Sequence, residues 1–208
     1  MNKTKTIKLE KLADIRTGLS LREAIKPVEN GNAFILQIKD IQDDNEIDYS
    51  RITQTTLKTI KAKRMLHRGD ILLRARGVNR SAALFDGQGK NYQAANQFLI
   101  IRVTEDELLP EYLQWYLNQK PAQQYLAENS TGTSIPYTQA STLANLGIIV
   151  PSRQKQRAIA QLQKLSRDEE HVIQQIIVNR KQMMNAIVYD LMKQSKTTKQ
   201  QTQQTQQT

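Results

Sequence analysis

Cysteine is absent from the 208 residues, and histidine occurs only twice, as His67 and His171. The lack of cysteine excludes disulfide bonds and thiolate metal sites and is typical of a reducing compartment. A histidine-based metal cluster is not expected because the two histidines lie far apart in the sequence. We therefore expect a cytoplasmic protein without a metal site.

Long apolar runs are also missing. No stretch approaches the roughly 20 apolar residues that a membrane helix needs, and the opening MNKTKTIKLEKL lacks the apolar segment of a signal peptide. Membranes are therefore not expected as partners. Aromatic residues make up only 5% of the chain, so the core should consist mainly of Leu, Ile and Val.

Acidic residues are fewer than basic ones. The 20 Asp and Glu residues are set against 30 Lys and Arg, which gives a net charge of +10. This excess favours polyanionic partners such as nucleic acids. General solubility is the alternative explanation, and composition leaves it open.

Recognisable signatures of catalysis are lacking. The stretch DGQGK (86–90) is too short for a phosphate-binding Walker loop and lacks the terminal GK[ST]. The sequence contains no dinucleotide fingerprint and no Gly-x-Ser-x-Gly elbow, and no pair of carboxylates is spaced for acid–base catalysis. We therefore predict a non-catalytic protein.

Three regions differ in their patterns. Residues 1–151 mix short strand-like runs and turns with a few helices, without regular alternation of strand and helix, which predicts an α+β domain. Residues 152–194 contain neither Pro nor Gly and predict one long helix, with Ser152 as its N-cap. Residues 195–208 are polar and of low complexity, and we expect them to be disordered.

Two shorter helices are predicted inside the first region. LLPEYLQWYLNQ (108–119) places Pro110 in the first turn of a helix that buries Leu113 and Leu117. Thr138 is the expected N-cap of a short helix over QASTLANL.

The long helix carries apolar residues at three- and four-residue steps. Such a wide apolar arc cannot be covered by a domain of this size alone, so we expect a second helix to pack against it. The predicted interface consists of Leu162, Leu165, Val172, Ile176, Met183, Ile187 and Leu191.

Charge is segregated in the first region. Residues 58–80 hold eight basic side chains and one acid, Asp70, whereas residues 40–48 hold five acids and no base. In the strand predicted within RGDILLRARGVNR (68–80), Arg74 and Arg76 share a side, and arginine can pair with phosphates or with a guanine edge. Any one of these arginines could instead pair with the acidic loop or be solvated.

A second candidate segment is STGTSIPYTQ (130–139). Small hydroxyl side chains, a Gly and backbone N–H groups ahead of a helix can hold a phosphate. An ordinary capped loop is the alternative.

The order of these motifs resembles the type I restriction-modification specificity subunits. The resemblance rests on KLEKLADIRTG, LHRGDILLRARG, LLPEYLQWYLNQ and STGTSIPYTQASTLANLGIIVPSRQKQRAIAQL, and it covers about residues 7–194. The usual proline-rich joint before the helix is here VPSRQKQ, with Lys155 where an acid is common. The family pattern has two recognition domains and two long helices, and this chain resembles one half.

The resemblance implies a function for each part. The first region would be a target-recognition domain for double-stranded DNA, and the helix would pair antiparallel in a homodimer that reads two inverted half-sites. DNA methyltransferase subunits, which bring S-adenosylmethionine, would dock on the helices, and a restriction-translocation subunit would join through them. This chain itself would bind no cofactor.

The residues themselves suggest which side chains contact DNA. We predict base or phosphate contacts by Arg74, Arg76, Asn79, Arg80, Thr133, Ser134, Tyr137 and Gln139. We predict that the DNA backbone is held by Lys61, Lys63, Arg64 and Arg68. Two other functions compete with this one: a coiled-coil protein whose globular head binds another protein, and a nuclease or methyltransferase in its own right.

Overall fold

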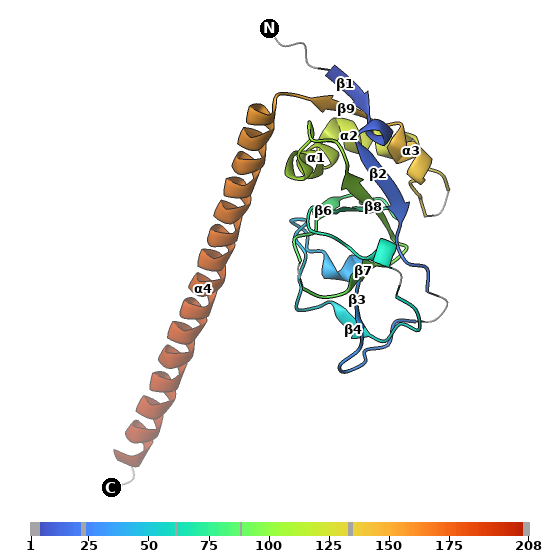
Figure 1. Cartoon of the computed structure of the whole chain (residues 1–208). Helices are drawn as coiled ribbons and strands as arrows, with labels where there is room; N and C mark the ends of the chain where they lie inside the picture. The colour runs from blue at the N-terminus through green and yellow to red at the C-terminus, as the bar shows by residue number, and fades with distance from the viewer. Residues whose placement is uncertain (1–4, 22–23, 61, 88, 133–134, 206–208) are drawn as a thin grey trace. The chain divides into compact units, whose positions relative to one another are not determined.

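The computed structural model divides into two compact units, Met1–Gln161 and Leu162–Thr208 (Figure 1). It describes residues 5–21, 24–60, 62–87, 89–132 and 135–205, with side chains described up to Lys193. No helix among these residues is both long and apolar enough to cross a membrane.

A four-stranded antiparallel sheet forms the centre of the first unit. Its strands, in spatial order, are β2 (Ala13–Thr17), β8 (Phe98–Val103), β5 (Ile71–Arg74) and β6 (Ala82–Leu84). The two inner strands, β5 and β8, are nearly continuous runs of Ile and Leu, and Ile71 pairs with Ile101 in their register. Such runs are typical of strands buried on both faces.

Both faces of the sheet are covered. Ile71 and Leu73 belong to one hydrophobic core and Leu72 belongs to another, as the alternation of side chains along a strand requires. The predicted alternation is therefore confirmed, but the side that Leu72 shares with Arg74 also faces a core. A strand with two apolar faces leaves room for arginine only at its end.

A smaller sheet covers the face to which Leu72 points. It contains β4 (Thr53–Thr55), β3 (Ala33–Leu36) and β7 (Tyr92–Ala94), with β3 and β7 parallel. Three 3-10 turns, η1 (Leu9–Lys11), η2 (Ile38–Asp40) and η3 (Ala62–Arg64), lie in the connections. Figure 1 shows this small sheet at the opposite end of the domain from the helices.

Short helices and a strand pair cover the other face. They are α1 (Pro110–Leu117), α2 (Lys120–Glu128), α3 (Ala140–Ala144) and the antiparallel pair β1 (Lys5–Lys8) and β9 (Gly147–Val150). Pro110 starts α1 as predicted, and Leu113 and Leu117 are fully buried. The mixture of strands and helices confirms the α+β prediction.

The predicted cap of α3 was wrong. The N-cap position is Gln139, and no side chain caps the helix there. Thr138 is fully buried instead, and its hydroxyl lies 3.0 Å from the Ser130 hydroxyl. The side chain of a threonine ahead of a helix can point toward the helix N-terminus or into the domain. Here the Ser130 hydroxyl provides a partner inside the domain.

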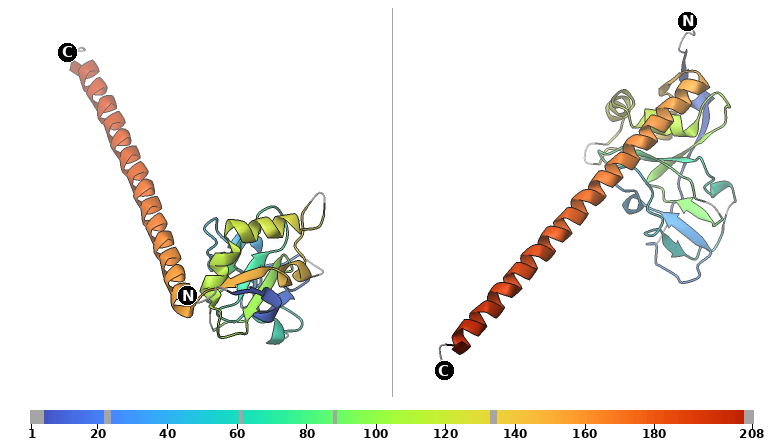
Figure 2. Two further views of the ribbon diagram at one scale, coloured as in Figure 1. Left: turned by 90° about the horizontal axis from the view of Figure 1, so that it is seen from above. Right: turned by 90° about the vertical axis from the view of Figure 1, so that its left-hand side faces the viewer.

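The long helix α4 (Arg153–Thr205) begins directly after Ser152, as predicted, and is continuous (Figure 2). It extends past residue 194 into the polar segment 195–208 that was predicted to be disordered. Glutamine is a good helix former, and the segment contains no Pro or Gly to end the helix. The seven apolar residues of the predicted interface are all exposed in the single chain.

Candidate nucleic-acid interface

Two segments that are far apart in the sequence meet after strand β5. Arg76 and Tyr137 form an antiparallel bridge. The Gly77 N–H donates to the Pro136 carbonyl at 2.9 Å, and the Thr138 N–H donates to the Ala75 carbonyl at 2.8 Å. We call residues 75–80, 130–132 and 135–139 together the loop pair. The structure thus joins the described parts of the two candidate segments into one surface feature.

Arg76 stacks on an aromatic ring within the loop pair. Its guanidinium carbon lies 5.6 Å from the centre of the Tyr137 ring, a distance at which a cation and an aromatic face attract each other. Arg76 is exposed and Tyr137 is half-buried. The ring therefore orients the arginine while leaving its side chain accessible to solvent.

Arg80 is buried, although its charge suggested an exposed side chain that contacts DNA. Only 5% of the residue is exposed, its Nε donates to the Ser130 hydroxyl at 3.0 Å, and its Nη1 donates to the Val78 carbonyl at 3.0 Å. The Gln123 amide in turn donates to the Arg80 carbonyl at 3.0 Å. Arg80 therefore joins the two halves of the loop pair from inside and has little surface left for DNA.

Arg74 also turns inward. Its Nη2 donates to the Ile41 carbonyl at 3.0 Å, at the start of the acidic loop. Burial lowers the pKa of the Arg74 guanidinium, and the neighbouring Asp43 acts in the opposite direction. This matches the alternative that an arginine of this strand contacts the acidic segment.

Of the remaining residues predicted to contact bases, some are exposed and others lie outside the described residues. Asn79 and Gln139 are exposed. The Asn79 side-chain oxygen accepts the Ser81 N–H at 3.0 Å, and that of Gln139 accepts the Ser141 hydroxyl at 3.4 Å. Thr133, Ser134 and Lys61 lie outside the described residues.

The predicted backbone-holding residues lie ahead of β5. Lys63 and Arg68 are exposed, and Arg64 is half-buried. We call residues 62–68 the basic segment. Because it precedes β5 and the loop pair follows β5, the two features lie at opposite ends of that four-residue strand, about 13 Å apart along its length.

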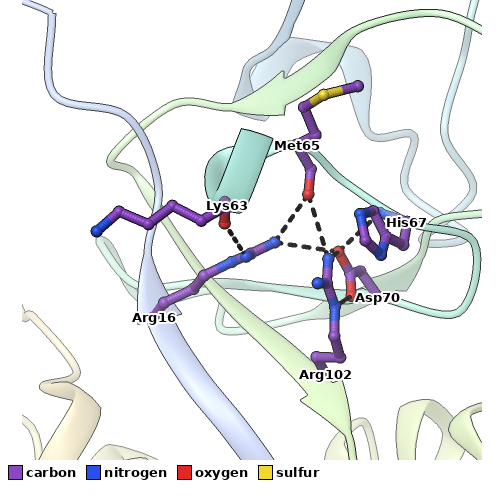
Figure 3. Close-up of polar contacts among 6 residues, drawn as sticks. All are labelled: Arg16, Lys63, Met65, His67, Asp70 and Arg102. Carbon is purple, nitrogen blue, oxygen red and sulfur yellow. Dashed lines mark hydrogen bonds and ion pairs between the residues drawn. The ribbon is translucent and has the colours of Figure 1, made fainter. Parts of the chain in front are cut away.

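Sequence reasoning missed the ion cluster that fixes the basic segment (Figure 3). Asp70 is 1% exposed and accepts two hydrogen bonds from Arg102, both at 2.7 Å. Arg16 lies 3.3 Å from the same carboxylate, and the His67 N–H donates to it at 2.9 Å. The single acid among eight bases was the available signal, and its partly buried arginine partners come from β2 and β8.

The two arginines of the cluster also bind the backbone of the basic segment. Arg16 donates to the carbonyls of Lys63 and, at 3.0 Å, Met65, and Arg102 donates to the Met65 carbonyl at 3.2 Å. The hydrogen bonds that Arg102 donates to Asp70 raise the pKa of Arg102, whereas burial and the nearby Arg102 lower the pKa of Arg16. The cluster thereby holds the backbone from which Lys63 projects.

A buried amide fixes the first turn of α4 to the domain. Gln156 is fully buried, and its side-chain oxygen accepts the Leu109 N–H at 2.8 Å. Its nitrogen donates to the carbonyls of Glu107 and Pro151, both at 2.8 Å. Sequence reasoning treated the VPSRQKQ joint only as a departure from a pattern and did not single out Gln156.

The sequence of the chain matches a known family. The model of the type I restriction modification DNA specificity domain matches residues 1–177, so the chain belongs to this family. The type I restriction enzyme MjaIX specificity subunit of Methanocaldococcus jannaschii is 27% identical over 157 residues. The match spans 74% of this chain but only 35% of that protein.

Solved structures with the same fold bear related titles. The S subunit of a type I restriction-modification system from M. genitalium has a TM-score of 0.56 at 18% identity, covering 87% of this chain and 44% of that one. The HsdS subunit from Thermoanaerobacter tengcongensis has a TM-score of 0.57 at 18% identity, covering 84% and 40%. A chain from a study of complex assembly and conformational transition of the type I R-M system has a TM-score of 0.62 at 17% identity, covering 83% and 40%. The chain thus spans less than half the length of each relative.

Proposed function

We propose that this protein is the sequence-reading subunit of a type I restriction-modification complex and binds double-stranded DNA without catalysing a reaction itself. The observation that carries the proposal is the loop pair, in which an exposed arginine is oriented by Tyr137 in a chain that belongs to the DNA specificity family. Arginine with a fixed orientation suits bidentate contact with a guanine edge.

The features at the two ends of β5 would have different roles in DNA binding. The loop pair would contact base edges through Arg76, Asn79 and Gln139, together with Thr133 and Ser134. The basic segment would hold the phosphate backbone through Lys61, Lys63, Arg64 and Arg68. A separation of about 13 Å along a strand is comparable with the major-groove width of about 12 Å, so one feature can lie in a groove while the other contacts its edge. Arg74 and Arg80 would support this surface from within.

The long helix α4 would pair with the helix of a second copy and so form the DNA-binding dimer. The seven predicted interface residues are between 46% and 67% exposed in the single chain, and burying such an arc is the main source of stability in paired helices. A two-fold dimer would place two recognition domains on DNA and read two inverted half-sites with an unread spacer. Methyltransferase subunits carrying S-adenosylmethionine, and a restriction-translocation subunit, would dock on this assembly.

Light scattering tests the pairing. The purified chain should have the mass of a dimer, and Ile176→Lys combined with Ile187→Lys should give a monomer. Gln174→Lys combined with Asn185→Lys adds the same charge at exposed polar positions of α4 and serves as the control. A wild-type monomer would contradict the homodimer.

Selection from a pool of duplexes with a randomised core tests the DNA reading. The full chain, together with its methyltransferase subunits, should enrich duplexes with two inverted half-sites at a fixed spacing. Retention of the chain on random duplex should also fall steeply between low and moderate salt. Failure to enrich any sequence would contradict the proposal and favour a head domain that binds protein.

A further inference from the structure

Two apolar side chains lie at the tip of the loop pair. Val78 is 83% exposed and Ile135 is 65% exposed. The other large apolar residues that are exposed before Gln161, among those that the structure describes, do not exceed 43%. Isolated exposed apolar residues are common on protein surfaces, but these two occur together at one place.

Backbone contacts of their chain neighbours bring the two residues close together. Arg76 is bridged to Tyr137, and the Gly77 N–H donates to the Pro136 carbonyl. Val78 directly follows Gly77 and Ile135 directly precedes Pro136, so the two apolar residues flank this hydrogen bond. Gly77 has a φ of +94°, a conformation that residues with side chains rarely adopt, and it turns the chain at this point.

Hydrogen bonds inside the domain hold the backbone next to Val78 and Ile135. The buried guanidinium of Arg80 contacts the Val78 carbonyl and the Ser130 hydroxyl, and that hydroxyl lies 3.0 Å from the Thr138 hydroxyl. Valine and isoleucine are also restricted at χ1 by their branching. Little conformational freedom is therefore left to lose when the tip meets a ligand, which favours binding.

We propose that Val78 and Ile135 contact the C5-methyl group of a thymine in the major groove, next to the base that Arg76 reads. This inference rests on the proposed function and extends it to a class of base. The thymine methyl is the apolar group that the major groove presents, and the exposed Arg76 and Asn79 beside the tip supply polar contacts of the kind that base edges need. A protein partner is a separate possibility that the experiment distinguishes.

The experiment removes the methyl group from DNA and the apolar side chain from the protein. The probe is the duplex selected by the wild-type chain with its methyltransferase subunits, in which each thymine in turn is replaced by uracil. Affinities are measured for the wild type, Val78→Ala and Ile135→Ala. Val28→Ala, which is also exposed but lies outside the loop pair, is the control.

One thymine per half-site should respond. Its replacement by uracil should weaken wild-type binding about three- to tenfold, since a buried methyl group contributes on this scale. In Val78→Ala or Ile135→Ala the same replacement should change affinity by less than about twofold, because the contact is already lost. Val28→Ala should behave like the wild type, and unfolding curves should show that all variants are folded.

Three other outcomes would contradict the thymine contact, and they differ in whether the proposed function also fails. Equal uracil penalties in the wild type and the tip variants would show that the tip does not touch a thymine methyl, while the proposed function would stand. Unchanged DNA binding with loss of methyltransferase co-purification would assign the tip to a protein contact. A wild-type chain that selects no sequence would defeat the proposed function and this inference together.

Discussion

The guanidinium of Arg76 lies 5.6 Å from the centre of the Tyr137 ring, although the two residues belong to segments far apart in the chain. The backbones of the two residues also form a bridge. Side chain and backbone therefore link the same two positions, and the orientation of Arg76 depends on Tyr137.

This dependence predicts coupling between the two residues in DNA binding. Arg76→Ala, Tyr137→Leu and the double variant form a cycle measured on the selected duplex. The loss of binding free energy in the double variant should be smaller than the sum of the single losses by about 0.5–1 kcal/mol. Tyr137→Phe keeps the ring and should bind nearly like the wild type, whereas additive losses would show that the stack does not matter for binding.

Lys63 should contribute to affinity without contributing to sequence preference. It is exposed on η3, and a phosphate contact carries no sequence information. Lys63→Ala should weaken binding to selected and unrelated duplexes by the same factor. It should also reduce the slope of log K against log salt by about 1.

Lys11→Ala is the matched control for Lys63→Ala, because Lys11 is an exposed lysine of η1 outside the proposed surface. It should leave the salt slope nearly unchanged. A loss in Lys63→Ala that is confined to the selected duplex would contradict the assignment of Lys63 to the DNA backbone.

Asp70 should be important for stability. Asp70→Asn removes the charge that Arg102 and Arg16 contact and leaves two partly buried arginines without their carboxylate. Loss of one member of a buried charge cluster typically costs about 3–5 kcal/mol, so the free energy of unfolding in urea should fall by about 3 kcal/mol. Glu111→Gln, at an exposed position of α1, should change it by less than about 0.5 kcal/mol. Equal effects of the two changes would contradict a central role for the cluster.

Local features of the fold could be predicted from the sequence. Pro110 begins α1, α4 begins after Ser152, and the side chains of β5 alternate between two sides. Each of these follows from neighbouring residues, because helix starts and strand alternation are set by short-range chemistry. The order of the motifs also pointed to the correct family.

Contacts between distant segments could not be predicted in the same way. The sequence indicated that Arg80 is basic but not that Ser130 would bind its guanidinium inside the domain. Thr138 lies only eight residues from Ser130, but the sequence also left open whether its hydroxyl would cap a helix or join Ser130. The identity of a polar side chain leaves its partner open when that partner lies tens of residues away.

Gln156 provides a test of how α4 is joined to the domain. Gln156→Leu keeps the approximate volume of the side chain but leaves the Leu109 N–H and the carbonyls of Glu107 and Pro151 without their partner. Unpaired buried polar groups cost about 1–3 kcal/mol each, so the free energy of unfolding should fall by at least about 2 kcal/mol. Gln154→Leu, at an exposed position of the same turn, should have little effect. A similar small effect of both changes would show that Gln156 does not fix the joint.

The central claim is that Arg76 reads a base. The most direct measurement is parallel selection from one randomised duplex pool by the wild type and by Arg76→Ala, each with the methyltransferase subunits. The account predicts that the variant loses the preference for one base at a single position of each half-site, at a cost of about 1–3 kcal/mol, and keeps the rest of the site. Identical selected sites for the two proteins would contradict it.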